Sequence, residues 1–137
     1  KGHHLEKREE VGWAELVGTE IISMTKDTSV RHLMEQAFAK IGESLNPTYE
    51  ASYMSTVISM VEAGLGITVL PSLALSTLRL PNVQLRPLHN PVVRREIGIL
   101  SKKNKVFAPA AKVFLEILTK DNSVKTLIRE IRWNSGQ

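Results

Sequence analysis

The chain has 137 residues, of which 42% are hydrophobic and 23% are charged, a composition that excludes an intrinsically disordered protein. It contains no cysteine, which excludes disulfides, thiolate metal sites and cysteine nucleophiles. No apolar run approaches the ~20 residues of a membrane-spanning helix, and the first residues do not resemble a signal peptide. We therefore expect one globular domain that lies in the cytoplasm.

Charge is distributed unevenly along the chain. Residues 1–78 contain 6 basic and 10 acidic side chains, whereas residues 79–137 contain 12 basic and 4 acidic ones, so the net charges are −4 and +8. A basic segment can bind nucleic acid or a membrane surface. These basic residues are spread over several expected elements and are not interleaved with aromatic side chains. A solvated surface, or contact with an acidic neighbouring domain, is the simpler interpretation.

The first half of the chain alternates strand and helix patterns. After a polar segment with a short helical turn around Trp13, residues 20–24 form an apolar, β-branched run that predicts a buried strand. Residues 29–42 predict an amphipathic helix, because apolar side chains recur at spacings of three and four. The cycle repeats with a weaker strand at 48–52, a helix at 55–64 and a strand at 67–70. This order predicts an α/β fold with a parallel βαβαβ sheet and right-handed crossovers.

The pattern changes after residue 78. Residues 83–86 and 95–100 predict two further strands with a turn region between them. Pro109 favours the first position of a helix. The apolar stripe of that helix comprises Ala110, Val113, Phe114, Ile117 and Leu118. After a break at 121–123, a last amphipathic stretch contains Val124, Leu127, Ile128 and Ile131.

No arrangement of residues indicates an enzyme or a metal site. The four histidines, at positions 3, 4, 32 and 89, have no spacing that would place two of them on one helix face. The segment Gly64-Leu65-Gly66 follows a helix and enters a strand, which is the reverse of a nucleotide-binding loop. We read it as a helix end and a tight turn. We therefore expect no catalytic residues, no metal and no cofactor.

Two loops that each lead from a strand into a helix are the best candidates for ligand binding. In a parallel sheet, the loops at 25–29 and 53–56 open on the same edge, where ligands usually bind. Each loop offers hydroxyl groups, backbone amides and the positive end of a helix dipole, which together could hold a small anion such as a carboxylate. The alternative is that these hydroxyls only cap their helices.

Several segments resemble the effector-binding domain of LysR-type transcriptional regulators. The most specific is YMSTVISMVEAGLGITVLPSLAL, at 53–75. Similar matches are GHHLEKREEVGWAELVGTEIISM, DTSVRHLMEQAF, LRPLHNPVVRREIGIL and FAPAAKVFLEIL. The resemblance covers roughly residues 2–120. His4 stands where proline is common in the family, and the tail beyond Lys120 has no counterpart.

The resemblance implies a fold like that of periplasmic binding proteins (type 2), built from two α/β subdomains. It places a leading segment at 1–18, the second effector-binding subdomain at 19–101, a return helix toward the first subdomain at 102–120, and an amphipathic tail at 121–137. It also implies that DNA is bound only through an N-terminal helix-turn-helix, which is not in this chain. A lobe of a periplasmic solute-binding protein is the alternative with the same architecture.

The family clamps a small-molecule effector between its subdomains, and the matching positions here lie in the two loops already selected. The ligand-binding residues that the resemblance implies are Thr25, Thr28, Ser29, Met54, Ser55 and Thr56. Gly64, Gly66 and Pro71 match the family strongly, and we assign them to the fold. We expect a small anionic effector and self-association into a homodimer or larger, with Phe114 and Ile117 at or near the contact.

Overall fold

The computed structural model describes residues 3–75, 80, 82–95, 98–100, 102 and 106–120. The chain divides into two compact units, one of Lys1–Pro71 with Leu78–Arg95 and one of Ser72–Thr77 with Glu96–Gln137. The amphipathic stretch predicted at 124–131 lies outside the described residues. Within the described part, no helix combines the length and the apolar character needed to cross a bilayer.

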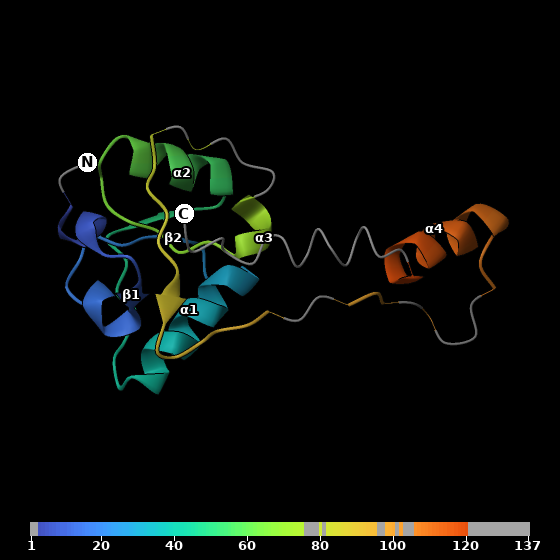
Figure 1. The fold of residues 1–137 in the computed structure, drawn as a ribbon, viewed down its shortest axis with the longest axis horizontal. Coiled ribbons are helices and arrows are strands. Elements are labelled where there is room, and N and C mark those ends of the chain that lie inside the picture. The colour runs from blue at the N-terminus through green and yellow to red at the C-terminus, as the bar shows by residue number, and fades with distance from the viewer. Residues whose placement is uncertain are drawn as a thin grey trace. The chain divides into compact units, whose positions relative to one another are not determined.

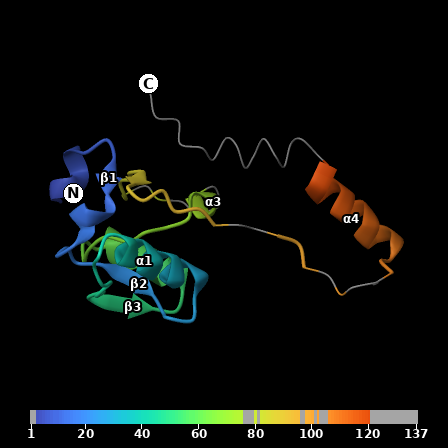
Figure 2. The ribbon, with the colours of Figure 1, turned by 90° about the horizontal axis from the view of Figure 1, so that it is seen from below.

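The first unit contains a parallel pair of strands, β2 (Ile22–Met24) and β3 (Tyr49–Ala51), joined by helix α1 (Ser29–Lys40). Figure 2 shows the two strands side by side. Helix α2 (Met54–Glu62) follows β3 and packs against both strands. In Figure 1, α1 and α2 lie on opposite sides of these strands. The predicted combination of helices with parallel strands is confirmed.

The third strand of the predicted sheet is reduced to a single parallel bridge between Ile21 and Ile67. The Ile22 amide donates to the Ile67 carbonyl at 2.8 Å, and the Ile67 amide donates to the Glu20 carbonyl at 2.9 Å. The position of the strand predicted at 67–70 is therefore right, but its length is wrong. The chain diverges from β2 after Ile67, so the backbone amides of residues 68–70 do not form strand hydrogen bonds with it.

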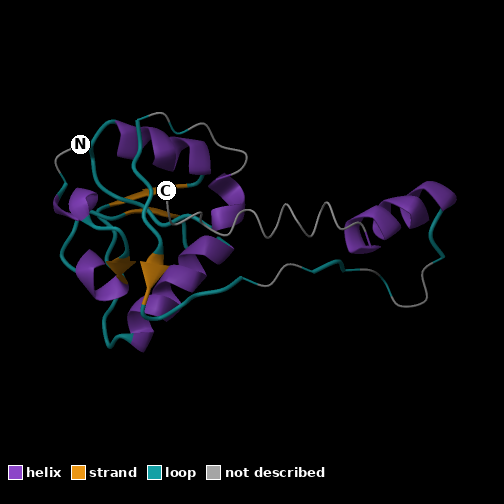
Figure 3. Cartoon of the chain, in the orientation of Figure 1, coloured by secondary structure: helices purple, strands orange, loops and turns teal. Residues whose placement is uncertain are grey.

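A second parallel pair joins β1 (Val11–Gly12) to β4 (Leu88–His89), shown as the separate orange arrows in Figure 3. The sequence predicts a strand at 83–86, and this prediction is wrong because the pairing begins at Leu88, two residues beyond the predicted end. The Arg86 guanidinium instead holds the leading segment, donating to the carbonyl oxygens of Glu6, at 2.7 Å, and of Arg8. A strand forms only where a partner aligns with it, and local residue preference does not specify that register.

The strand predicted at 95–100 is also not found at its described positions, Arg95 and 98–100. Its apolar residues Ile99 and Leu100 are exposed, Leu100 almost completely. No strand in the described part of the chain pairs with them. An isolated apolar run cannot form a ladder without such a partner.

Both helices of the first unit end at a glycine with a left-handed backbone. Gly42 has φ 78° and Gly64 has φ 80°. After α2, the Gly64 amide donates to the Val61 carbonyl and the Leu65 amide donates to the Met60 carbonyl, which is the Schellman pattern. The reading of Gly64-Leu65-Gly66 as a helix end and turn is confirmed.

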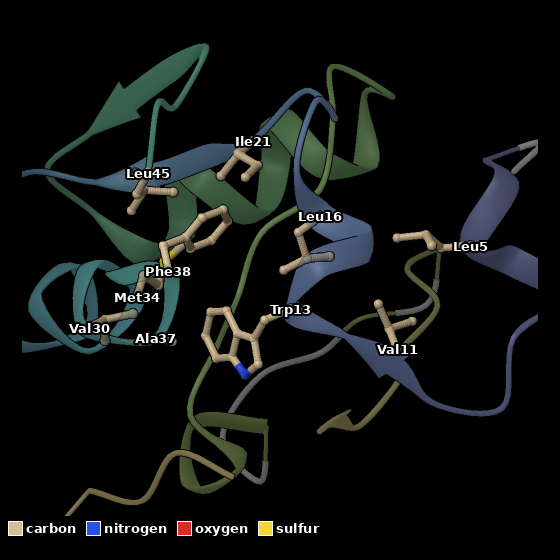
Figure 4. Close-up of a cluster of buried hydrophobic side chains, with 10 residues drawn as sticks. All are labelled: Leu5, Val11, Trp13, Leu16, Ile21, Val30, Met34, Ala37, Phe38 and Leu45. Carbon is tan, nitrogen blue, oxygen red and sulfur yellow. The ribbon is translucent and has the colours of Figure 1, made fainter. Parts of the chain in front are cut away.

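The core of the first unit gathers on the predicted apolar face of α1. Figure 4 shows the indole ring of Trp13 beside the Phe38 ring. The ring centroids are 5.9 Å apart and nearly perpendicular, a favourable edge-to-face geometry. Trp13 belongs to the short 3-10 helix Trp13–Leu16; a second one spans His4–Lys7. The Trp13 indole also donates to the Pro91 carbonyl at 2.9 Å. This hydrogen bond attaches the segment around Pro91, which follows β4, to the core.

The second unit contains the short helix α3 (Ser72–Leu75) and helix α4 (Pro109–Lys120), the orange helix of Figure 1. The prediction that Pro109 opens a helix is confirmed. The apolar side chains of α4 are unevenly covered. Ala111 and Leu115 are half-buried, whereas Val113 and Phe114 are 57% and 60% exposed.

Candidate functional site

The carboxyl ends of β2 and β3 lie next to each other. In the parallel register, Met24 is paired with Ala51, and these are the last residues of their strands. The chain then passes through one short loop into α1 and another into α2. The structure therefore brings together, at one edge of the sheet, the two loops that hold the six predicted ligand-binding residues.

The loop before α1 uses its hydroxyl groups for its own structure. Thr28 is the N-cap residue, and its hydroxyl oxygen accepts from the Arg31 amide at 3.3 Å. The same hydroxyl donates to the Thr25 carbonyl at 2.9 Å. Ser29, the first residue of α1, is exposed. The Thr28 hydroxyl thus acts as a helix cap, the alternative that the sequence left open for this residue.

Thr25 is half-buried, and its side chain forms a hydrogen bond with Asp27, which is not among the six predicted ligand-binding residues. A hydrogen bond from Thr25 is the main cause that lowers the pKa of the Asp27 carboxyl below its ordinary value. Asp27 is exposed, as is its neighbour Lys26. This loop therefore presents one carboxylate and one ammonium group beside the start of α1.

The loop before α2 is built differently, because its helix has no side-chain cap. The N-cap residue is Tyr53, which makes no capping hydrogen bond and is 74% exposed. The first bond at this end runs from the Val57 amide to the Tyr53 carbonyl at 3.1 Å. The amides of the first turn of a helix have no acceptor inside it. Here they belong to three predicted ligand-binding residues, Met54, Ser55 and Thr56.

Ser55 and Thr56 are exposed and Met54 is half-buried. Two hydroxyl groups thus lie beside three amides at the positive end of the α2 dipole, an arrangement that attracts an anion. Sequence reasoning selected these residues but not Tyr53. No local signal could have found Tyr53, because Tyr is a poor N-cap residue compared with Ser, Thr, Asp or Asn and does not mark the start of a helix.

The charge of the buried Arg31, in the first turn of α1, is already balanced by two carboxylates. Arg31 is 3% exposed, and its guanidinium lies 2.8 Å from a Glu35 carboxylate oxygen and 2.6 Å from one of Glu50. The hydrogen bond from Arg31 is the main cause that lowers the pKa of Glu35. Because Glu50 belongs to β3 and Arg31 to α1, the ion pair ties the helix to the sheet.

Metal ligands do not gather in the described residues, where no group of three or more His, Asp or Glu side chains could hold an ion. The rings of His3 and His4 are 4.4 Å apart. However, the His3 Nδ1 atom accepts from the Leu5 amide at 3.3 Å. The lone pair of His3 Nδ1 is therefore used in a hydrogen bond of the local turn and is not free to bind a metal ion.

Comparison with known proteins gives a consistent family. The family model described as the LysR substrate binding domain matches residues 1–123. The chain is 39% identical over 118 residues to the uncharacterized HTH-type transcriptional regulator YbhD of Escherichia coli (strain K12), which is 86% of this chain and 37% of that protein. It is 25% identical over 117 residues to the transcriptional dual regulator GltC of Bacillus subtilis (strain 168), which is 85% of this chain and 39% of that protein.

The HTH-type transcriptional regulator YfeR of Shigella flexneri, also named as uncharacterized, is 29% identical over 108 residues, which is 79% of this chain and 35% of that protein. The chain thus spans less than two fifths of the length of these relatives. The family has a type 2 periplasmic-binding-like α/β fold, with which the helices and parallel strands described above agree. With a family match over residues 1–123 and bacterial transcriptional regulators as relatives, the chain belongs to the LysR substrate-binding domain family.

Proposed function

We propose that this chain is the ligand-sensing part of a bacterial LysR-type transcriptional regulator that works in the cytoplasm. In the full-length protein it binds a small effector and thereby controls DNA binding and transcription, while DNA is contacted through a helix-turn-helix outside this chain. Family membership supports this role, because the matching domain is described as substrate binding and the relatives are named as transcriptional regulators. The chain itself carries out no catalysis in this proposal.

The observation that carries the proposed site is the uncapped start of α2 beside the loop that precedes α1. We assign the ligand-binding residues to Thr25, Thr28, Ser29, Met54, Ser55 and Thr56. Their roles differ: the two threonines shape the first loop through their mutual hydrogen bond, whereas the amides and hydroxyls that open α2 bind the ligand. An anionic effector such as a carboxylate fits that helix end.

In this proposal the segments keep the assignments that the sequence resemblance implies. Residues 1–18 lead into the second effector-binding subdomain at 19–101, and residues 102–120 contain the return helix toward the first subdomain. The cleft is completed by the first subdomain, whose remaining residues lie outside this chain. The type 2 periplasmic-binding-like fold of the family supports this division.

We further propose that the chain self-associates into a homodimer or larger assembly, with Phe114 and Ile117 at or near the contact. Both side chains project from α4 and are 60% and 48% exposed. Burying a large apolar side chain stabilises a protein by roughly 1.5–3 kcal/mol relative to leaving that side chain in water. Contiguous exposed apolar surfaces of this kind usually mark contacts with other proteins.

A gel-shift experiment with the full-length gene product tests the proposed function. The full-length protein should retard a fragment of its own promoter, and an added effector should change the affinity or the pattern of that complex. A full-length protein that is exported, binds a small molecule and does not bind DNA would instead support the lobe of a periplasmic solute-binding protein.

A further inference from the structure

Arg31 is hydrogen-bonded toward both loops of the proposed site, through different parts of the residue. Its backbone amide donates to the Thr28 hydroxyl at 3.3 Å, and that hydroxyl donates to the Thr25 carbonyl. Its guanidinium donates to a Glu50 carboxylate oxygen at 2.6 Å, and Glu50 is the last but one residue of β3. Arg31 is therefore connected on one side to the loop before α1 and on the other side to the strand that leads into α2.

The guanidinium of Arg31 is buried and held in one orientation. The side chain is 3% exposed, and its Nε atom donates to a Glu35 carboxylate oxygen at 2.8 Å. Glu35 lies four residues further along α1, so this second pair is contained within the helix. Charge-assisted hydrogen bonds are stronger than neutral ones, and the planar guanidinium fixes the direction of each. The contact with Glu50 connects α1 to β3, whereas the contact with Glu35 does not.

The place of Glu50 in the chain determines what this contact can position. The next residue, Ala51, is paired with Met24 at the end of β2, and α2 begins at Met54. A shift of Glu50 relative to α1 would therefore move the start of α2 relative to the loop before α1. A binding site needs its groups to be held within about 0.5 Å of the productive geometry. Arg31 is too buried to contact a ligand, so it can act on the site only through these neighbours.

We propose that Arg31 is the positioning residue of the effector site, and that it keeps the loop before α1 and the start of α2 at a fixed spacing. It acts on the first loop through Thr28 and on the second through Glu50. The Arg31–Glu35 pair has no part in this positioning, because both of its residues belong to α1. The inference rests on the ligand site proposed above and adds the residue that determines its geometry.

Glu35 and Glu50 form a matched pair of positions for a test. Each side chain is 39% exposed, and each accepts one hydrogen bond from the same guanidinium. Glu35→Ala and Glu50→Ala therefore remove the same charge and one contact each with Arg31. Both should lower the urea midpoint of the 137-residue chain, because each leaves the buried guanidinium with one carboxylate fewer. Arg31→Ala would remove both contacts at once and could not separate them.

Binding of acetate, measured by NMR from the amides that open α2, distinguishes the two variants. Glu50→Ala should weaken acetate binding about fivefold. This is less than the loss of a whole hydrogen bond to a charged ligand, because the donors remain and only their placement changes. Glu35→Ala should leave the affinity nearly unchanged. Glu50→Gln keeps an acceptor oxygen within reach of Arg31 and should restore most of the affinity.

The outcomes separate failure of the positioning role from failure of the proposed site. A loss of stability in both Ala variants, with a loss of affinity in Glu50→Ala alone, supports the positioning role. If Glu35→Ala weakens acetate binding as much as Glu50→Ala, or if neither weakens it, Arg31 only stabilises the fold and the inference is overturned while the site remains. If the unsubstituted chain shows no saturable shift at the start of α2, the proposed site itself is overturned.

Discussion

At the scale of single residues, hydroxyl groups that look equivalent in the sequence have different uses. Thr28 and Thr56 both occur at the start of a helix, but the Thr28 hydroxyl caps α1 whereas Thr56 is exposed in the uncapped first turn of α2. The main role of the Thr28 hydroxyl is therefore to stabilise the start of α1, whereas the Thr56 hydroxyl is available to a ligand. This difference yields predictions for each loop.

Replacing Thr56 by Val keeps the shape of the side chain and removes its hydroxyl. In the full-length regulator we expect effector binding to weaken by about 1 kcal/mol or more, because one hydrogen bond to a charged ligand is lost. DNA binding without effector should be nearly unchanged. Isothermal titration with the effector measures this change. Ser59→Ala, an exposed hydroxyl further along α2, is the matched control, and an equal loss in both variants would contradict the assignment.

Replacing Thr25 by Val should raise the pKa of Asp27 toward its ordinary value, because the hydrogen bond that lowers it is removed. The lowered pKa in the folded state gives a stabilising contribution that is present above the ordinary pKa of 3.8. This contribution is lost as the pH falls through the lowered folded value. An NMR titration of the Asp27 carboxyl carbon measures the shift. An unchanged midpoint in the variant would show that Thr25 does not set it.

At the scale of elements, the turn at 64–67 passes close to the segment that leads into β2. A Cβ atom on Gly66, which has φ 154°, would lie 2.2 Å from the Glu20 carbonyl oxygen. The backbone of the turn must therefore pass where no side chain fits. The hydrogen bonds that Ile67 makes with Glu20 and with Ile22 depend on this approach.

Gly66→Ala should consequently destabilise the fold by about 2 kcal/mol or more, through both the clash and the strained backbone. Gly42→Ala has a left-handed backbone but no atom nearby, so it should cost about 1 kcal/mol. Gly98→Ala, with open space and no positive φ, should be close to neutral. Urea denaturation measures all three. A Gly66 variant as stable as the Gly98 variant would contradict this account of the turn.

The helices could be predicted from the sequence because their signals are local. The spacing of apolar residues such as Val30, Met34 and Phe38 was sufficient to predict α1. The strands were less predictable because each depends on a distant partner. The pairing of Val11 with Leu88 joins residues far apart in the chain, and neither short segment has a strong strand pattern. Apolar residues at 99–100 were read as a strand although no described partner aligns with them.

The position of the candidate site could be predicted from the sequence, but the roles of its individual side chains could not. Strand order alone indicates that the loops after β2 and β3 meet at one edge, and the structure agrees. Which hydroxyls are already used could not be read from the sequence, because Thr25 and Thr28 bond to groups that the loop conformation brings close. Tyr53 as an uncapped helix start is also visible only once the helix boundary is known.

At the scale of the whole molecule, the charge of the chain does not by itself make it a DNA-binding protein. The net charge is +4, and residues 79–137 carry the excess of basic side chains. We expect this chain to bind DNA only weakly and without sequence preference, because dispersed Lys and Arg residues contact phosphates rather than bases. Fluorescence anisotropy should show binding that falls steeply with salt. A sequence-specific complex that survives ~200 mM salt would contradict this expectation.

The central claim is that the chain senses a small anionic ligand at the start of α2, and an NMR titration of the isotopically labelled chain tests it most directly. Small carboxylates such as acetate, succinate and benzoate should shift the backbone amides of Met54, Ser55 and Thr56 more than any others. Matched neutral amides of the same shape should not do so. Shifts confined to the basic residues after position 78, or no saturable shift at millimolar carboxylate, would contradict the claim.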